Sequence, residues 1–175
     1  MAEDRLEQTN IILTGFMGTG KTTIGRLLAA ELDYEFIDTD ALITERHGPI
    51  PQIFASEGEE VFRALERELA RELAGRDKVV IATGGGMLVD KENARLLAER
   101  GRIFCLTAAP QTILERVSAA AGERPLLDGP DPERRITDLL NRREAAYQLF
   151  TQVPTDGRFP NEIVDLIINL LDTTA

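Results

Sequence analysis

Eight residues near the start of the chain have the types and spacing that bind a chain of phosphates. They read Gly15-Phe16-Met17-Gly18-Thr19-Gly20-Lys21-Thr22 and match the P-loop pattern G-x-x-x-x-G-K-[ST]. The glycines let backbone N–H groups surround phosphate oxygens, and the following helix adds the positive end of its dipole. Lys21 would reach the β- and γ-phosphates, and the Thr22 hydroxyl would hold Mg²⁺. We therefore predict a nucleoside triphosphate site, against the alternative of a glycine-rich turn with a chance lysine.

Two carboxylates and three consecutive glycines follow later apolar runs. Asp38 and Asp40 close the run FIDTD, and Gly84, Gly85 and Gly86 follow KVVIAT. If both runs are parallel strands, their carboxyl ends lie at the same edge of the sheet as the P-loop. The carboxylates also fit a plain helix start, as an N-cap and a first-turn acid. The glycines also fit an ordinary strand-to-helix turn, so both alternatives stay open on these residues alone.

Several arginines lie where an anionic ligand could be held. Arg63 is on a segment rich in charge, where a solvated arginine is the common case. Arg124 begins the sequence RPLL in a loop of glycines and prolines, and Arg143 and Tyr147 are one turn apart on the next predicted helix. Six arginines fall between Arg116 and Arg143, so this part of an acidic chain is locally positive.

The elements that must position these residues alternate between strand and helix. Apolar runs predict strands at 10–14, 34–37, 78–83 and 102–106, with a weaker candidate at 151–153. Helical periodicity predicts helices at 21–33, 58–75, 111–121, 133–150 and 160–171, and another from an Asp90 N-cap to about Gly101. Glycines and prolines predict a loop at 122–132. This alternation indicates a parallel sheet with helices on both faces.

The composition excludes several classes of protein. The chain has 175 residues, 43% of them apolar, and no apolar run approaches the ~20 residues that span a bilayer. A net charge of −10 argues against sequence-independent binding of nucleic acid. The lone Cys105 is predicted to be a core thiol in a reducing cytoplasm, and the lone His47 a surface residue at a helix end. No His/Cys cluster has the spacing of a metal site, so Mg²⁺ bound with the nucleotide is the one metal expected.

Taken in order, these motifs resemble the shikimate kinase family. The series GFMGTGKTTIGRLLA, FIDTD, IFASEGEEVFRALE, GGG and RPLL, followed by Arg143 and Tyr147, runs from about Ile11 to about Leu170. The resemblance implies a P-loop fold of the nucleoside monophosphate kinase group, α/β in three layers, with a five-stranded parallel sheet. It implies one domain over 1–175, with substrate-binding helices at about 40–75 and a lid at about 118–132. The implied reaction transfers the γ-phosphate of ATP, with Mg²⁺, to the 3-hydroxyl of shikimate in chorismate biosynthesis.

The resemblance also implies how the acceptor is bound. Asp40 matches the aspartate that contacts the reacting hydroxyl and takes its proton. Arg63 and Arg143 match the arginines that hold the substrate carboxylate, a task that suits the two parallel N–H donors of a guanidinium. The backbone that lines the pocket is matched by Gly84, Gly85 and Gly86.

For the catalytic centre, the resemblance adds two residues to the P-loop. Asp38 matches the acid that supports Mg²⁺ beside Thr22. Arg124 matches the lid arginine that closes onto the transferred phosphate. The implied catalytic residues are therefore Lys21, Asp40 and Arg124, and positive charge on the phosphates is what phosphoryl transfer requires.

The adenine contacts are the least regular part of the match. Arg116, and Arg158 with Pro160, resemble the family's adenine contacts. The segment from Arg116 to Arg124 is one residue longer than in many relatives, and Ala145 stands where proline is usual. The predicted nucleotide-binding residues are Gly18, Thr19, Gly20, Lys21, Thr22, Thr23, Arg116, Arg124 and Arg158. The expected ligands are ATP, Mg²⁺ and shikimate, bound by a monomer.

Two other functions fit some of these features. Another small-molecule kinase of the same fold, acting on gluconate or a nucleoside monophosphate, would keep Lys21 and Thr22. It would not need Arg63, the three glycines and Arg143 together. A regulatory module that binds ATP without turnover would have no need of Asp40 or of the arginines.

Overall fold

A five-stranded parallel sheet forms the centre of the fold. The computed structural model describes residues 9–119 and 130–173. The strands are β1 (Asn10–Gly15), β2 (Glu35–Asp38), β3 (Val79–Ala82), β4 (Gly101–Thr107) and β5 (Thr151–Pro154). They lie in the order β2-β3-β1-β4-β5, and each neighbouring pair is parallel. Beginning from β1, the chain first adds β2 and β3 on one side of the sheet and then β4 and β5 on the other. The direction of winding therefore reverses at β1, and such folds bind ligands at this point.

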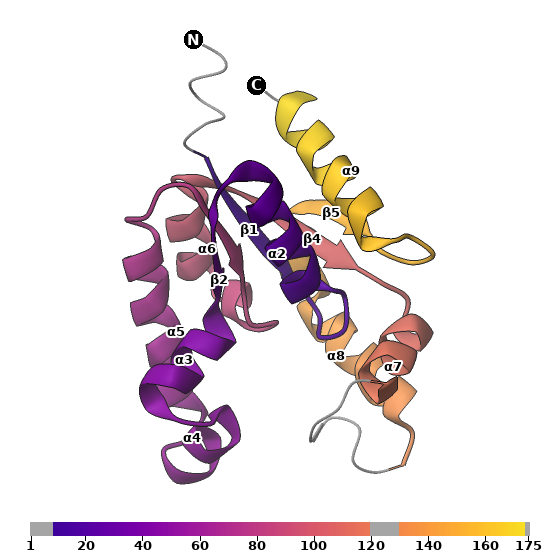
Figure 1. The fold of residues 1–175 in the computed structure, drawn as a ribbon. Coiled ribbons are helices and arrows are strands. Elements are labelled where there is room, and N and C mark those ends of the chain that lie inside the picture. The colour runs from indigo at the N-terminus through magenta and orange to yellow at the C-terminus, as the bar shows by residue number, and fades with distance from the viewer. Residues whose placement is uncertain (1–8, 120–129, 174–175) are drawn as a thin grey trace.

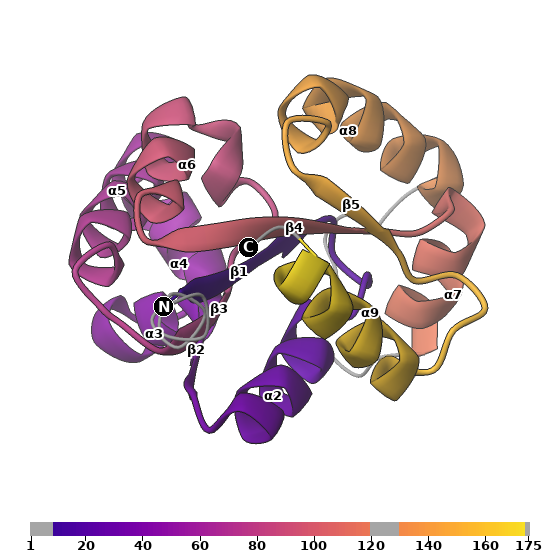
Figure 2. The same cartoon turned by 90° about the horizontal axis from the view of Figure 1, so that it is seen from above.

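Helices cover both faces of this sheet, as Figures 1 and 2 show. On one face lie α2 (Lys21–Leu32) and α9 (Pro160–Thr173), which pack against each other. On the other face lie α5 (Glu59–Leu73), α6 (Lys91–Ala98) and α8 (Pro132–Tyr147). The predicted three-layer α/β architecture with a five-stranded parallel sheet is therefore confirmed.

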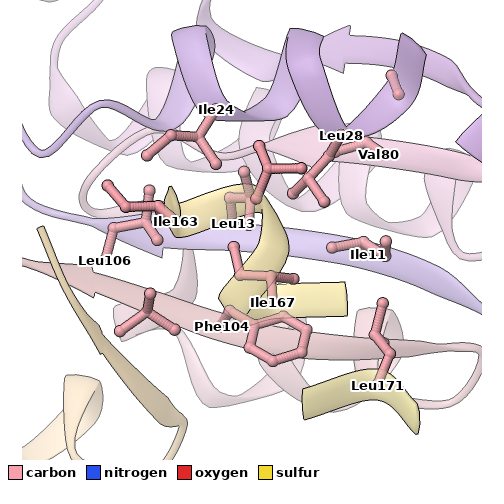
Figure 3. Packing of buried hydrophobic residues seen from close by; sticks show 13 residues of the cluster. Ile11, Leu13, Ile24, Leu28, Val80, Phe104, Leu106, Ile163, Ile167 and Leu171 are labelled. Carbon is pink, nitrogen blue, oxygen red and sulfur yellow. The ribbon is translucent and has the colours of Figure 1, made fainter. Parts of the chain in front are cut away.

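The core follows from the alternation of side chains along β1. Ile11 and Leu13 point to the face covered by α2 and α9, where they pack with Leu28 and Ile167 (Figure 3). Ile12 belongs to the cluster on the opposite face, with residues of α5 and α6. Because a central parallel strand is buried on both faces, it reads as a continuous apolar run in the sequence.

Short helices lie beyond the carboxyl ends of the strands. They are α3 (Thr39–His47), α4 (Ile50–Ser56), the 3₁₀ helix η1 (Met87–Val89) and α7 (Pro110–Ala119). In Figure 1, α3 and α4 lie on one side of this edge and α7 on the other, with the loop between β1 and α2 between them. Helices therefore lie on both sides of the loop between β1 and α2.

The predicted strands and long helices are found within one to three residues of their expected bounds. The weak candidate at 151–153 is β5, and Asp90 caps α6 by accepting a hydrogen bond from the amide of Glu92 at 2.9 Å. The helix after Asp90 ends at Ala98, earlier than predicted, because Gly101 already pairs with β1 as the start of β4. The division of 39–56 into α3 and α4 was not predicted, and the loop at 122–132 lies largely outside the described residues.

Two minor predictions are confirmed. Cys105 is fully buried beneath the P-loop, and burial raises the pKa of its thiol to about 12, so it is an inert core thiol. His47 is exposed in the last turn of α3. Across the described ranges, no helix has both the length and the apolar character needed to cross a membrane. The assignment of 1–175 to one domain, with its substrate-binding helices and lid, stays a prediction.

Candidate functional site

The P-loop joins β1 to α2 through three glycines with left-handed backbone angles. Gly15, Gly18 and Gly20 have φ values of 128°, 75° and 96°, which side chains other than glycine rarely adopt. A Cβ on Gly15 would also collide with the carbonyl oxygen of Leu106 on β4. No side chain caps the N-terminus of α2, so its first amides remain available to an anion. The sequence therefore specifies the loop geometry that phosphate binding requires.

Lys21 lies inside the loop that it would help to form. Its Nζ donates to the carbonyl oxygens of Gly15 and Phe16, both at 2.9 Å. Burial lowers the pKa of Lys21 to about 8, against the opposing charges of Asp40 and Asp38. The Lys21 amine is thus held close to the place where phosphates would bind. Its burial favours the neutral form over the ammonium.

Thr22 and Asp38 meet at the start of α2. The hydroxyl of Thr22 donates to Oδ2 of Asp38 at 2.8 Å, although the two residues come from different elements. The other oxygen, Oδ1, accepts from the amides of Asp40 and Ala41 at 3.1 and 3.2 Å. Asp38 therefore caps the N-terminus of α3, as the alternative interpretation predicted. Its Oδ2 still lies beside Thr22. A hydroxyl and a carboxylate together fit Mg²⁺, which prefers oxygen ligands.

Three predicted acceptor residues converge on Gly84, Gly85 and Gly86, which we call the glycine segment. Its first glycine lies directly against the carboxylate of Asp40. A Cβ on Gly85 would lie 3.0 Å from Nη1 of Arg143, and one on Gly86 would lie 2.7 Å from Nη1 of Arg63. Any side chain here would push these groups away. The structure therefore brings together residues from α3, α5, α8 and the loop after β3, as the resemblance implies.

The carboxylate of Asp40 lies in surroundings that shift its pKa. Burial, and next the charge of Asp38, raises the pKa of Asp40, while Lys21 and Arg63 oppose the rise. The carboxylate is thus a stronger proton acceptor than an exposed aspartate, and it lies between the P-loop lysine and the arginines.

Arg63 is held by two carboxylates of its own helix. Its Nη1 donates to Glu66 at 2.7 Å, and its Nε and Nη2 donate to Glu59 at 3.2 and 3.0 Å. Glu66 is only 2% exposed, and burial raises its pKa against the opposing charge of Arg63. We did not predict a role for Glu66. Its spacing of three residues from Arg63 on one helix face was the signal that could have found it.

Arg143 and Tyr147 reach the glycine segment from α8. The guanidinium of Arg143 lies over the ring of Phe16 in the P-loop, 5.5 Å from its centroid. The hydroxyl of Tyr147 donates to the carbonyl oxygen of Gly85 at 2.6 Å. Our predictions noted Tyr147 for its position one turn after Arg143 but gave it no function.

The predicted adenine side is only partly assembled. The guanidinium of Arg116 donates to Oγ1 and to the backbone oxygen of Thr155, each at 2.9 Å. It also donates to the carbonyl oxygen of Gly18 at 3.3 Å. It therefore ties α7 to the P-loop and to the segment after β5. Arg158 is exposed, and no contact draws it to the P-loop within the described residues. Arg124 lies outside them.

A pocket of 550 Å³ lies between the exposed side of α2 and the start of α9. Its wall is mostly apolar and includes the predicted nucleotide-binding residue Thr23 together with Pro160. Thr23 is thus near the segment that contains Arg158 and Pro160, as expected if both border one nucleotide.

Comparison with known proteins places this arrangement in context. The family model for shikimate kinase matches residues 17–172. A shikimate kinase from Thermus thermophilus is 47% identical over 165 residues, which cover 93% of this chain and 90% of the relative. The structure of shikimate kinase from Acinetobacter baumannii in complex with shikimate has a TM-score of 0.88 and 35% identity, and the match covers 99% and 98% of the two chains. A gluconokinase from Sinorhizobium meliloti, at 20% identity and a TM-score of 0.61 over 95% and 98% of the chains, shares the fold alone.

Proposed function

This chain belongs to the shikimate kinase family and is therefore an ATP-dependent kinase that acts on shikimate, and we propose how its residues carry out the transfer. The supporting observation is that Asp40, Arg63 and Arg143 all border the glycine segment, next to the P-loop. A kinase for gluconate or a nucleotide would not need Arg63, the glycine segment and Arg143 together. A regulatory module would not require a carboxylate of raised pKa beside the P-loop lysine.

The acceptor's carboxylate binds between Arg63 and Arg143. A guanidinium has five N–H donors, and the bonds of Arg63 to Glu59 and Glu66 use three of them. One N–H remains on each terminal nitrogen of Arg63, and both nitrogens lie against Gly86. A carboxylate there would receive two parallel hydrogen bonds, which fixes its orientation as well as its charge. The acceptor's ring then lies against the backbone of the glycine segment.

The nucleotide binds through the P-loop, with the amides of residues 18–23 on its phosphates. Lys21 gives up its bonds to the loop carbonyls and reaches the β- and γ-phosphates. Thr22 and Asp38 would hold Mg²⁺, which neutralises charge on the β- and γ-phosphates when it is bound. Arg116 contributes to the adenine side from α7, where its guanidinium lies beside the P-loop.

In the transfer, the 3-hydroxyl oxygen of shikimate forms a bond to the γ-phosphorus. The bond from that phosphorus to the β,γ-bridging oxygen breaks, and ADP leaves with its electron pair. The hydroxyl proton passes to Asp40, whose raised pKa suits this role. Phosphoryl transfer depends mainly on alignment and on positive charge, so Asp40 chiefly orients the hydroxyl while Lys21 stabilises the developing charge.

Further parts of the proposal rest on the resemblance alone. Arg124 in the segment 118–132 would close onto the transferred phosphate, which would exclude water and limit hydrolysis of ATP. A monomer working in the cytoplasm, without nucleic acid or membrane, stays a prediction.

The direct test is ADP release from ATP and Mg²⁺ with shikimate, quinate, gluconate or no acceptor. We expect release that depends on shikimate, because the family that the chain belongs to acts on it and its carboxylate and 3-hydroxyl suit the two arginines and Asp40. Faster release with gluconate would transfer the proposal to another acceptor. Binding of ATP without release on any acceptor would contradict the kinase activity.

A further inference from the structure

The three carbonyl oxygens of the glycine segment are all hydrogen-bonded, but not in the same way. The carbonyl oxygens of Gly84 and Gly86 accept from the nearby amides of Met87 at 3.1 Å and Val89 at 3.2 Å. These are local turns at the start of η1. The carbonyl oxygen of Gly85 instead accepts from a side chain of another element, the Tyr147 hydroxyl at 2.6 Å.

That bond fixes the orientation of a whole peptide plane. The carbonyl of Gly85 and the N–H of Gly86 belong to one trans peptide, so they point in opposite directions. Within the part of the chain that the structure describes, neither Gly85 nor Gly86 donates its amide to a backbone or side-chain acceptor. Glycine on both sides leaves this plane unusually free to rotate. The bond from the Tyr147 hydroxyl therefore directs the Gly86 N–H away from α8. A Cβ on Gly86 would lie 2.7 Å from Nη1 of Arg63, so this guanidinium borders the same residue.

We propose that Tyr147 is a positioning residue for shikimate binding: its hydroxyl holds the Gly85–Gly86 peptide in the orientation that presents the Gly86 N–H to the acceptor. The inference rests on the proposed function, because the acceptor is assumed to lie against the glycine segment. Without this bond the peptide plane would sample other orientations, and the acceptor would have to select the productive one on binding.

The surroundings of Tyr147 suit this role. The residue is only 6% exposed, and its ring belongs to the cluster that contains Phe16, Cys105 and Ile136. Its own carbonyl oxygen accepts from Nε2 of Gln152 at 2.7 Å, which ties the end of α8 to β5. Burial raises the pKa of the phenol, so the hydroxyl remains a donor at the pH of an assay. A ring so well packed holds its hydroxyl at a fixed place.

The test is Tyr147→Phe, which removes the hydroxyl and keeps the ring. We expect KM for shikimate to rise about threefold to tenfold, the effect of one neutral hydrogen bond. KM for ATP should change less than about twofold, since the P-loop amides are untouched. The ¹⁵N–¹H resonance of Gly86 should shift or broaden as its peptide plane gains freedom. The control is Tyr34→Phe, in the other tyrosine of the chain, which packs against the opposite face of the sheet and should change none of these values.

The outcomes separate this inference from the proposed function. Shikimate-dependent ADP release by the unmodified protein, measured in the same series, tests the proposed function alone. An unchanged KM for shikimate in Tyr147→Phe, or an unchanged Gly86 resonance, would overturn the positioning role. Equal rises in both KM values with a lower melting temperature would assign Tyr147 a structural role only, which also overturns it.

Discussion

At the scale of single residues, the site depends on charges that are only partly compensated. Lys21 is held by two loop carbonyls, and burial lowers its pKa to about 8. Burial raises the pKa of Asp40, which favours its neutral acid. Both shifts oppose the charged form in the protein without ligands. Binding of a polyanionic nucleotide reverses the balance at Lys21, because phosphates favour the ammonium.

This reversal predicts that the protein takes up a proton when it binds ATP near pH 8. About half of Lys21 is neutral at that pH before binding, and the bound phosphates raise its pKa, so about half a proton should be absorbed. The uptake should vanish near pH 6, where Lys21 is already charged. Calorimetry in buffers of different ionisation enthalpy measures it.

The matched control for proton uptake is Lys21→Arg, whose guanidinium stays charged at every accessible pH. Its uptake at pH 8 should be close to zero. An equal uptake in both proteins would show that another group titrates and would contradict the assigned state of Lys21.

The roles of some single residues could be predicted from the sequence, and those of others could not. The P-loop was predictable because its glycines and lysine have a fixed spacing that follows from phosphate geometry. Glu66 was not, because an acid on a charged helix reads as a solvated residue until its burial is known. Arg116 was predicted at the adenine, but nothing in the sequence pointed to its bonds with Thr155 and Gly18.

At the scale of elements, the glycine segment is the structural centre of the proposed acceptor site. It follows β3, and helices α3, α5 and α8 each bring one functional side chain against it. Its backbone can approach these groups because no Cβ intervenes. The position of the segment thus couples the carboxylate and both arginines.

We predict that Gly86→Ala weakens shikimate binding while the protein stays folded. Gly86 has φ of −99°, which alanine adopts easily, so the backbone is not strained. The new Cβ would lie 2.7 Å from Nη1 of Arg63 and displace its guanidinium. Charge-assisted bonds contribute about 1.5–3 kcal/mol, so KM for shikimate should rise about tenfold or more.

Gly75→Ala at the end of α5 is the control, since its Cβ would meet only the carbonyl oxygen of Glu72 at 3.5 Å. Steady-state kinetics with both substrates, together with thermal unfolding, compares the two variants. If Gly86→Ala left KM for shikimate at the level of Gly75→Ala, the close approach of Arg63 to this backbone would be irrelevant to binding.

Elements differed in how well the sequence predicted them. The central strands are buried on both faces and gave clear apolar runs, whereas β5 has a single buried residue, Val153, and gave almost no pattern. The break between α3 and α4 follows from Gly48, with φ of 92°, and Pro49, a pair that stops a helix. Gly48 and Pro49 are visible in the sequence, but the residues on either side of them have no strong helical periodicity, so the two helices were not predicted.

At the scale of the whole molecule, the P-loop helix is held by the core on one face of the sheet. Leu28 of α2 is fully buried in the cluster that β1 and α9 share (Figure 3). Its neighbour Leu27 is 37% exposed. Alternation along the chain predicted this layered core. It could not predict the order of the strands, because sheet order depends on contacts between segments far apart in the sequence.

Leu28→Ala should lower the free energy of unfolding by about 2–5 kcal/mol, through lost burial and a cavity. Leu27→Ala on the same helix should cost less than about 1 kcal/mol, because its side chain already contacts water. Urea unfolding measures both. Similar losses in the two variants would contradict the packing of α2 against α9.

Calorimetry of shikimate and of ATP with Arg63→Ala tests whether the acceptor and the nucleotide bind at separate places. We expect the affinity for shikimate to fall about tenfold to a hundredfold, as for the loss of a charge-assisted pair, with the affinity for ATP within about twofold. Arg67→Ala, one turn further along α5, is the control, and its partner Asp90 lies 3.6 Å away, outside the glycine segment. Arg63→Lys keeps the charge beside buried Glu66 and should also bind shikimate weakly, because it lacks the planar fork. Unchanged shikimate affinity, or an equal loss for both ligands in a folded protein, would contradict a carboxylate site formed at Arg63 beside a separate nucleotide site.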